Sequence, residues 1–311
     1  MLCNFVDDFV KINVNSRYID KVVAVVVTYN PDLKRLAQVV HSLEIEVKDI
    51  VIVDNGSGNI ANIEKIAGGK TIIKMGKNKG IAEGMNKGIA RVLLQHRSVE
   101  WILTLDQDTI LRKGAISEIF RKFETLPKSI RNKTGILAMS PKEKDRDMYT
   151  YPVLENNNFV RKLFAQTSGN LVRVEIFESV RFRDDFFIDQ VDHEFDMVVR
   201  SKGFLIIEYD KKTLDHSLGK KEKVGNKEID YYNERRLYYY TRNSTYLITH
   251  YKGFPLGMYV LGILSMYSRF LRVNRTRGLL VGLYVFLISF KDGVIGNLGE
   301  NKHISEMKLI R

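Results

Sequence analysis

Two aspartates, Asp106 and Asp108, stand directly after the apolar run WILTL at residues 101–105. Such a run is typical of a buried strand. In an open α/β sheet, ligands bind just outside the carboxyl ends of the strands, so both carboxylates are expected to meet a ligand. A divalent cation relieves the repulsion between close carboxylates while it bridges to phosphate oxygens. The spacing therefore suggests a metal-diphosphate site, although it also occurs in ordinary turns and caps.

Three other apolar runs, at residues 22–27, 50–53 and 71–75, also end in small or polar residues. Asp54 could accept a hydrogen bond from a nucleotide base or a ribose hydroxyl, and Gly80 allows close backbone approach to a ligand. Any one such end fits an ordinary turn, but four at one sheet edge describe the lip of a pocket. The candidate ligand-binding residues are Thr28, Tyr29, Asn30, Asp54, Asn55, Asn78, Gly80 and Asp106.

The segments between these runs have helical spacing. Apolar residues recur along one helix face in residues 33–43 and 81–92, and a further helix is expected over about 114–123. The resulting order β-α-β-β-α-β-α predicts a doubly wound α/β sheet. No G-x-G-x-x-G follows the first strand and no G-x-x-x-x-G-K-[ST] occurs, so the fingerprints of dinucleotide-binding and P-loop proteins are missing.

The composition predicts a globular protein with an anionic partner. The chain has 311 residues, an apolar content of 44%, one cysteine and a formal charge of +12. A single cysteine forms no internal disulfide, which fits a reducing compartment, and the first twenty residues do not look like a secretory signal. From Lys211 onward, 18 Lys and Arg face 8 Asp and Glu, an excess of 10. This asymmetry favours a compact domain followed by a basic segment with a different partner.

Four segments, VVVTYNPD, IVIVDNGSGN, KNKGIAEGMNKGI and WILTLDQDT, resemble glycosyltransferase family 2, the inverting enzymes of the GT-A fold. The similarity covers roughly residues 22–250 and is strongest to bacterial rhamnosyltransferases. It implies a Rossmann-like, mixed but mainly parallel sheet flanked by helices, with a helical C-terminal segment. It also implies a nucleotide-sugar donor linked to dTDP or UDP, with dTDP-rhamnose favoured.

The resemblance extends to the segment FFIDQVDHEF at residues 186–195, in which an acidic residue opens a helix. By position, Asp192 corresponds to the catalytic base that accepts the proton of the acceptor hydroxyl. The alternative for the acidic residues here is a solvated first turn of a helix. His216 resembles the histidine that completes the metal site of many members. Asp106, Asp108 and His216 are therefore expected to hold Mn²⁺ or Mg²⁺ on the diphosphate.

The tail holds two apolar stretches, at residues 254–266 and 278–290, with Arg269, Arg272, Arg275 and Arg277 between them. Both are shorter than the roughly 20 residues that span a bilayer. Two short helices joined by an arginine cluster suit an anionic membrane interface. A buried hairpin or a homo-oligomer interface fits the pattern equally well.

The predicted organisation is a lead-in over residues 1–20, a GT-A domain over 21–250 and a basic, apolar helical segment over 251–311. The predicted function is inverting, metal-dependent transfer of a sugar, most simply L-rhamnose, to a hydroxyl of a growing, lipid-linked cell-surface polysaccharide. The expected location is cytoplasmic, peripheral on the inner face of the plasma membrane. The alternatives are a galactofuranose, glucose or N-acetylhexosamine donor, or an inactive subunit that anchors a polysaccharide assembly. Nucleic acid is not expected, because it would explain the charge but not the strand-end pocket.

Overall fold

The computed structural model describes residues 17–141, 150–152, 158–216, 221–224, 227–230 and 233–306. It divides into two compact units. The sheet unit comprises the described parts of Met1–Lys79, Glu83–Phe182 and Phe195–His216, and the helical unit those of Gly80–Ala82, Arg183–Glu194 and Ser217–Arg311. The helical unit thus combines three segments of the chain. The predicted domain boundary at residue 250 stays a prediction.

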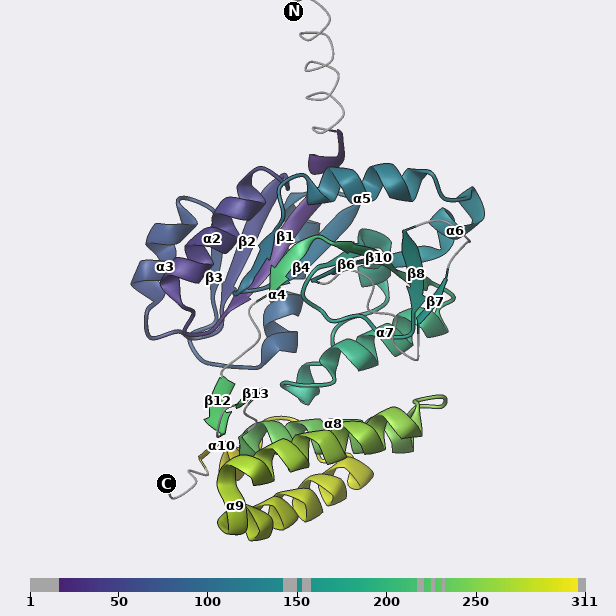
Figure 1. Ribbon diagram of the computed structural model, residues 1–311. Helices are drawn as coiled ribbons and strands as arrows, with labels where there is room; N and C mark the ends of the chain where they lie inside the picture. The colour runs from purple at the N-terminus through teal and green to yellow at the C-terminus, as the bar shows by residue number, and fades with distance from the viewer. Residues whose placement is uncertain are drawn as a thin grey trace, which may run out of the picture. The chain divides into compact units, whose positions relative to one another are not determined.

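Within the described residues, nine strands form the main sheet in the order β3-β2-β1-β4-β9-β6-β10-β8-β7 (Figure 1). The first four strands along the chain are mutually parallel, whereas β9 runs antiparallel to both β4 and β6. A mixed sheet therefore results, as expected. The strands are β1 (Val22–Thr28), β2 (Asp49–Asp54), β3 (Thr71–Lys74), β4 (Trp101–Asp106), β6 (Thr134–Ser140), β7 (Thr150–Pro152), β8 (Phe159–Lys162), β9 (Asn170–Arg173) and β10 (Leu205–Lys212).

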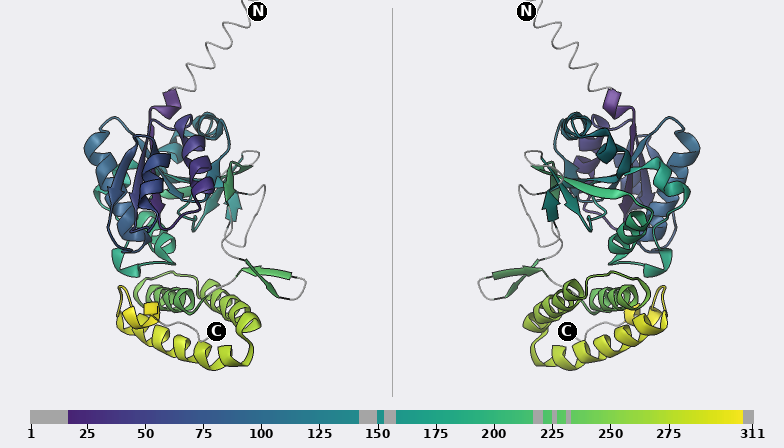
Figure 2. Two further views of the ribbon diagram at one scale, coloured as in Figure 1. Left: turned by 90° about the vertical axis from the view of Figure 1, so that its left-hand side faces the viewer. Right: turned by 90° about the vertical axis from the view of Figure 1, so that its right-hand side faces the viewer.

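Helices cover both faces of this sheet (Figure 2). Alternate residues of β1, such as Ala24, join the core beneath α2 and α5, while Val25 faces α4. A Cβ atom at Gly88 of α4 would lie 2.3 Å from Val25, so glycine is what lets this helix approach the sheet. The helices and 3₁₀ turn of the unit are α2 (Leu33–Glu44), α3 (Ile60–Ala67), α4 (Ile81–Gln95), α5 (Ala115–Glu124), α6 (Lys128–Lys133) and η1 (Val174–Glu178).

One part of the sequence-based order was wrong. The sequence pattern predicts no helix between the second and third strands, but α3 lies there, so strand and helix alternate regularly through β4. Its eight residues are shorter than the window over which helical periodicity can be recognised. Its apolar side is also narrow, with Ile63 and Ala67 as the buried residues.

The helical unit is built around α8 (Glu234–His250) and α9 (Leu256–Ile295). The two predicted tail helices are one continuous 40-residue helix, but α9 folds back on itself. The rings of Tyr267 and Phe286 lie 5.9 Å apart, whereas 19 residues of straight helix would separate them by about 28 Å. We call residues 256–272, before the bend, the first arm of α9, and residues 278–295, after it, the second arm (Figure 1).

The remaining elements are short, apart from α7, which begins in the helical unit and continues into the sheet unit from Phe195. A second, two-stranded sheet pairs β5 with β11 next to the end of β4. These elements are β5 (Thr109–Leu111), η2 (Asp184–Phe186), α7 (Val191–Ser201), β11 (Leu214–His216), β12 (Lys221–Val224), β13 (Lys227–Asp230) and α10 (Lys302–Glu306).

Candidate active site

Strand register brings the predicted residues of β1, β2 and β4 to one edge of the sheet. Thr28 pairs with Asp54, and the neighbouring Val27 pairs with Asp106. The Thr28 hydroxyl donates to the Asp54 carboxylate over 3.2 Å, and both side chains are buried. Parallel pairing thus creates the edge that the sequence predicts.

The Asp54 carboxylate is hydrogen-bonded to the loop that follows it. One oxygen accepts from the backbone N–H of Gly56 at 3.2 Å and of Ser57 at 3.0 Å. Only 2% of the residue is exposed. Gly56 has a φ of 84°, and a Cβ atom there would lie 2.6 Å from the backbone of Lys77, so the turn requires glycine. Asp54 shapes this loop, and its predicted contact with a nucleotide stays a prediction.

Asn55 ties this loop to the end of β3. Its side-chain nitrogen donates to the side-chain oxygen of Asn78 at 3.1 Å, and its own side-chain oxygen accepts from the Lys79 backbone N–H at 2.9 Å. With 3% of its surface exposed, Asn55 holds the two strand ends together from within. The structure therefore brings Asn55 and Asn78 together, as the pocket prediction requires.

The end of β1 is joined to its neighbours by side chains on both sides. Gln107 accepts from the Tyr29 N–H at 2.7 Å, and Asn30 accepts from the Gly58 N–H at 2.9 Å. The Tyr29 side chain itself is exposed. The role of Gln107 was not predicted. Its position between Asp106 and Asp108 could have indicated it.

The turn that carries Asp106 and Asp108 is fixed from two directions. Ser168 accepts from the Asp106 N–H at 3.0 Å, and its hydroxyl is hydrogen-bonded to that of Thr109 at 2.7 Å. From α2, Arg35 donates to the Asp108 carbonyl oxygen at 2.8 Å. The segment TSGNLVR at residues 167–173, which contains Ser168, resembles the strand over the donor site in this family, but its bond to Asp106 was not predicted. Arg35 matches no motif and was not predicted either.

The backbone of His216 pairs with Thr109 across the small sheet, one residue after Asp108. Arg35 strengthens this pairing, since it also donates to the carbonyl oxygen of Asp215 at 2.7 Å. The His216 side chain lies outside the described residues. No group of three potential metal ligands occurs among the described side chains, so the predicted triad of Asp106, Asp108 and His216 stays a prediction.

Asp192, the predicted base, is the second residue of α7, and one carboxylate oxygen accepts from the His193 N–H at 2.9 Å. The loop before it contains three non-glycine residues with left-handed backbone, at φ values of 64°, 61° and 62°. Such conformations cost free energy and persist only where the surroundings enforce them. These residues are Phe187, Asp189 and Gln190.

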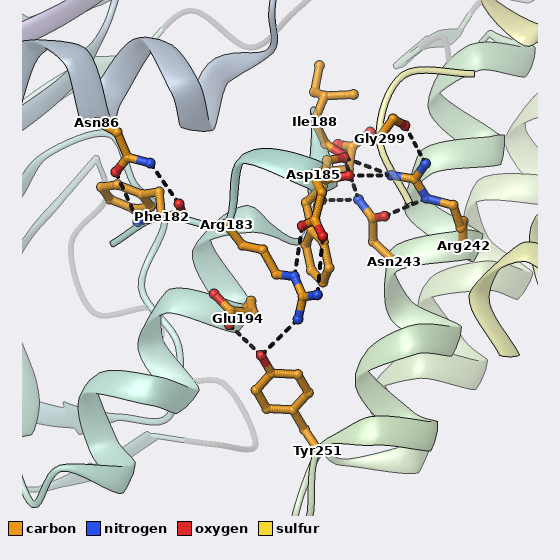
Figure 3. Close-up of polar contacts among 12 residues, drawn as sticks. Asn86, Phe182, Arg183, Asp185, Ile188, Glu194, Arg242, Asn243, Tyr251 and Gly299 are labelled. Carbon is orange, nitrogen blue, oxygen red and sulfur yellow. Dashed lines mark hydrogen bonds and ion pairs between the residues drawn. The ribbon is translucent and has the colours of Figure 1, made fainter. Parts of the chain in front are cut away.

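Two buried residues of α8 enforce this conformation (Figure 3). The Asn243 amide donates to the carbonyl oxygens of Phe186, Ile188 and Asp189 at 3.0, 2.9 and 2.8 Å. Arg242 donates to the carbonyl oxygens of Phe186 at 3.0 Å and Gly299 at 2.6 Å. Burial lowers the pKa of the Arg242 guanidinium, which lies over the rings of two tyrosines, Tyr238 and Tyr239.

Gly80 also packs against this loop. Its φ is 92°, and a Cβ atom would lie 2.5 Å from the Phe187 carbonyl oxygen. The same oxygen accepts from the Ile81 N–H at 2.9 Å. Gly80 therefore belongs to the helical unit with Asp192, while the other predicted nucleotide-binding residues belong to the sheet unit.

Comparison with known proteins decides the family. The model of "Glycosyl transferase family 2" matches residues 23–181, about half of the chain. This chain belongs to glycosyltransferase family 2. The predicted family and enzyme class are thereby confirmed.

A relative in Shigella flexneri, the "dTDP-rhamnosyl transferase RfbF", is 29% identical over 246 residues, covering 72% of this chain and 79% of that protein. Among solved structures, residues 1–349 of S. aureus TarS in complex with UDP-GlcNAc match with a TM-score of 0.55 at 16% identity, over 88% of this chain and 81% of that one. A longer TarS chain matches with a TM-score of 0.51 at 16% identity, over 82% of this chain but only 44% of TarS. These structures support the predicted GT-A fold.

The glycosyltransferase carries a buried acid, Glu194, two residues after the half-buried Asp192. Glu194 is 5% exposed, and one carboxylate oxygen accepts from the Tyr251 hydroxyl at 2.5 Å. Its other oxygen, Oε2, has no hydrogen-bond partner within the described residues. Burial raises the pKa of Glu194 above its ordinary value, and burial together with the bond to Glu194 raises the pKa of Tyr251 to about 12.

Arg183 completes this network. It donates to the Tyr251 hydroxyl at 3.3 Å (Figure 3). Two of its nitrogens also donate to the two carboxylate oxygens of Asp185, at 2.7 and 3.2 Å. The chain Asp185-Arg183-Tyr251-Glu194 thus links the start of the loop to the first turn of α7. Tyr251 was not predicted, because it follows the end of α8 and nothing in its neighbourhood marks it as a partner of Glu194.

Proposed function

We propose that this glycosyltransferase moves L-rhamnose from dTDP-rhamnose, with inversion, to a hydroxyl of a growing, lipid-linked cell-surface polysaccharide. The single observation that carries the choice of sugar is the similarity to a protein named as a dTDP-rhamnosyl transferase, which extends over 79% of that protein. The strand-end edge of the sheet unit supports a nucleotide-sugar site, because that is where ligands of open α/β sheets bind.

In the proposed donor complex, the nucleotide base lies near the exposed ring of Tyr29. Aromatic rings offer a stacking face to a base. Thr28 and Asp54 shape the floor of this site through their buried hydrogen bond. The remaining proposed donor contacts are Asn30, Asn55, Asn78, Gly80 and Asp106.

A divalent cation, Mn²⁺ or Mg²⁺, is proposed at Asp106, Asp108 and His216. The described backbone fits this proposal, because the aspartates flank a turn that Ser168 and Arg35 hold, and His216 pairs with the residue after Asp108. Two carboxylates and an imidazole are a suitable donor set for Mn²⁺. Bound there, the cation would stabilise the charge that develops on the departing diphosphate.

Asp192 is proposed to accept the proton of the acceptor hydroxyl. As the hydroxyl oxygen forms its bond to the anomeric carbon, the bond from that carbon to the diphosphate oxygen breaks on the opposite side. The configuration at the anomeric carbon therefore inverts. Asp192 lies in the first turn of α7, a position that the helix dipole favours for an acidic residue.

Calorimetric titration of the full chain with dTDP-rhamnose, UDP-glucose, UDP-galactofuranose and UDP-N-acetylglucosamine, each with Mn²⁺, Mg²⁺ or EDTA, tests the donor. Metal-dependent binding of dTDP-rhamnose alone supports the proposal. Preference for another sugar would contradict the rhamnose assignment but keep the reaction. The absence of binding to every donor, also after addition of a lipid-linked acceptor, would instead favour an inactive anchoring subunit.

A further inference from the structure

Exposed apolar side chains gather on α9. Of the fifteen large hydrophobic side chains exposed in the described parts of the chain, twelve lie on this helix, four on the first arm and eight on the second. Leu261 and Leu264 are 62% and 61% exposed on the first arm, and Leu280 is 75% exposed on the second. Scattered exposed leucines are ordinary, but a concentration of this kind marks an interaction surface.

The packed side of the second arm has a different character, because small and polar residues lie there beside the buried Val285. A Cβ atom at Gly282 would lie 3.6 Å from the Phe270 ring, and one at Gly293 would lie 2.5 Å from the Arg242 carbonyl oxygen. Asp292, 6% exposed, accepts from the Tyr238 hydroxyl at 2.5 Å. A helix at a water-exposed surface usually turns its large apolar side chains inward, whereas this arm exposes eight of them.

The second arm contains the window Gly278–Ile295, which among the described helices is long and apolar enough to cross a bilayer, a test that core helices of soluble proteins also pass. Two contacts oppose a crossing. Asp292 binds Tyr238 of α8, and Phe286 packs on Tyr267 of the first arm. These contacts hold the second arm beside α8 and the first arm, an arrangement that favours entry of its leucines into a membrane from the side.

Positive charge accompanies the apolar surface. Arg272, at the end of the first arm, and Lys291, near the end of the second, are both exposed. The chain from Lys211 onward carries an excess of 10 positive charges. A second copy docked on the same surface would bring two such basic segments together, at a cost in repulsion. An apolar face with cations beside it instead complements lipid tails and anionic headgroups.

We propose that the outward face of α9, defined by Leu261, Leu264, Leu280, Leu283, Leu287 and Arg272, binds the interface of an anionic lipid bilayer without crossing it. The protein would then be peripheral on the inner, cytoplasmic face of the plasma membrane. This membrane binding does not depend on the identity of the donor sugar. The suggestion that it brings the enzyme to a lipid-linked acceptor rests on the proposed function.

Vesicle flotation with the full chain tests this surface. We expect binding to vesicles of phosphatidylcholine with 30% phosphatidylglycerol to be about tenfold tighter than to phosphatidylcholine alone, and to weaken as salt rises. The triple variant Leu280→Glu, Leu283→Glu, Leu287→Glu should lose about tenfold or more of this binding. Leu94→Glu is the matched control, because Leu94 is 78% exposed on α4, and it should bind like the parent.

Three kinds of result would overturn the proposal. The first is a failed binding test, in which the parent does not bind anionic vesicles or the triple variant binds them as well as the parent. The second is a dimer, seen by sedimentation in the absence of lipid, that the triple variant converts to a monomer, since the surface would then join two copies. The third is resistance of bound protein to alkaline carbonate extraction, which marks a membrane span. Titration of each variant with the donor in solution shows whether the variant is folded. Because this titration involves no lipid, it also distinguishes failure of the membrane proposal from failure of the proposed sugar transfer.

Discussion

The sheet edge and the loop before α7 hold their functional side chains in different ways. At the edge, strand register already places Thr28, Asp54 and Asp106 together, and partners such as Asn55 lie in adjoining loops. The loop instead adopts left-handed backbone that residues of α8, more than fifty positions further along the chain, hold in place. We therefore expect damage at the edge to weaken donor affinity and damage at the loop to slow turnover.

The largest effect is expected from Asp192→Asn, which keeps the size of the side chain but removes its basicity. A general base contributes roughly 10²–10⁴-fold to rate, so kcat should fall by about 10³-fold. The Kd for the donor should stay within about twofold, because the strand-end residues are unchanged. Steady-state kinetics and donor titration measure the two quantities. A lost donor affinity, or a comparable fall in kcat for Asp189→Asn instead, would remove Asp192 as the base.

Asn243→Ala tests whether the loop conformation matters for turnover. The change removes three hydrogen bonds to the loop carbonyls, and a small displacement of a catalytic group can cost about 10²-fold in rate. We expect kcat to fall by about that factor, with a donor Kd within about twofold of the parent.

Asn274→Ala is the matched control for that variant. Among the described residues, the Asn274 amide donates to the Phe270 carbonyl oxygen within α9 at 3.0 Å and not to the loop. Its kcat should equal that of the parent. Equal kcat for Asn243→Ala and the parent would show that the loop keeps its conformation without this amide, and the contrast between the two regions would then disappear.

Asn55→Ala tests the sheet edge, where we expect a change in donor Kd and not in kcat. It removes the bonds that join the ends of β2 and β3, and about 1–1.5 kcal/mol of lost preorganisation would raise the donor Kd by about tenfold. Asn62→Ala, at an exposed position of α3, is the control and should leave the Kd unchanged. A fall in kcat at unchanged Kd would contradict the division of labour proposed for the two regions.

This division also explains what the sequence could predict. Strand runs and their polar ends are local patterns, and parallel pairing alone carries Thr28, Asp54 and Asp106 to one edge. The start of α7 at Asp192 was visible for the same reason, as an acidic residue that opens a helical pattern.

Long-range contacts left no such local signal. Phe187, Asp189 and Gln190 carry no mark of a left-handed backbone, because the usual mark is glycine. Ser168 and Arg35 fix the turn of the two aspartates from distant segments. The bend in α9 was read as a break between two helices, since helical periodicity says nothing about an arm that folds back on Phe270 and Tyr267.

The smallest expected effect is a pH dependence of stability that arises from Glu194, next to the loop before α7. Burial raises the pKa of Glu194 above the value of about 4.5 that it has in the unfolded chain. Below that value both states hold the proton and Glu194 adds no pH dependence. As the pH rises further, the unfolded chain loses the proton first, so the stability of the folded state falls until the raised pKa is passed. Glu194→Gln cannot ionise, and its unfolding temperature relative to the parent should therefore increase from pH 4 to pH 8. Asn62→Ala, at an exposed position of α3, changes no ionisable group and should show a gap that hardly changes with pH. A constant gap for Glu194→Gln as well would refute the burial argument.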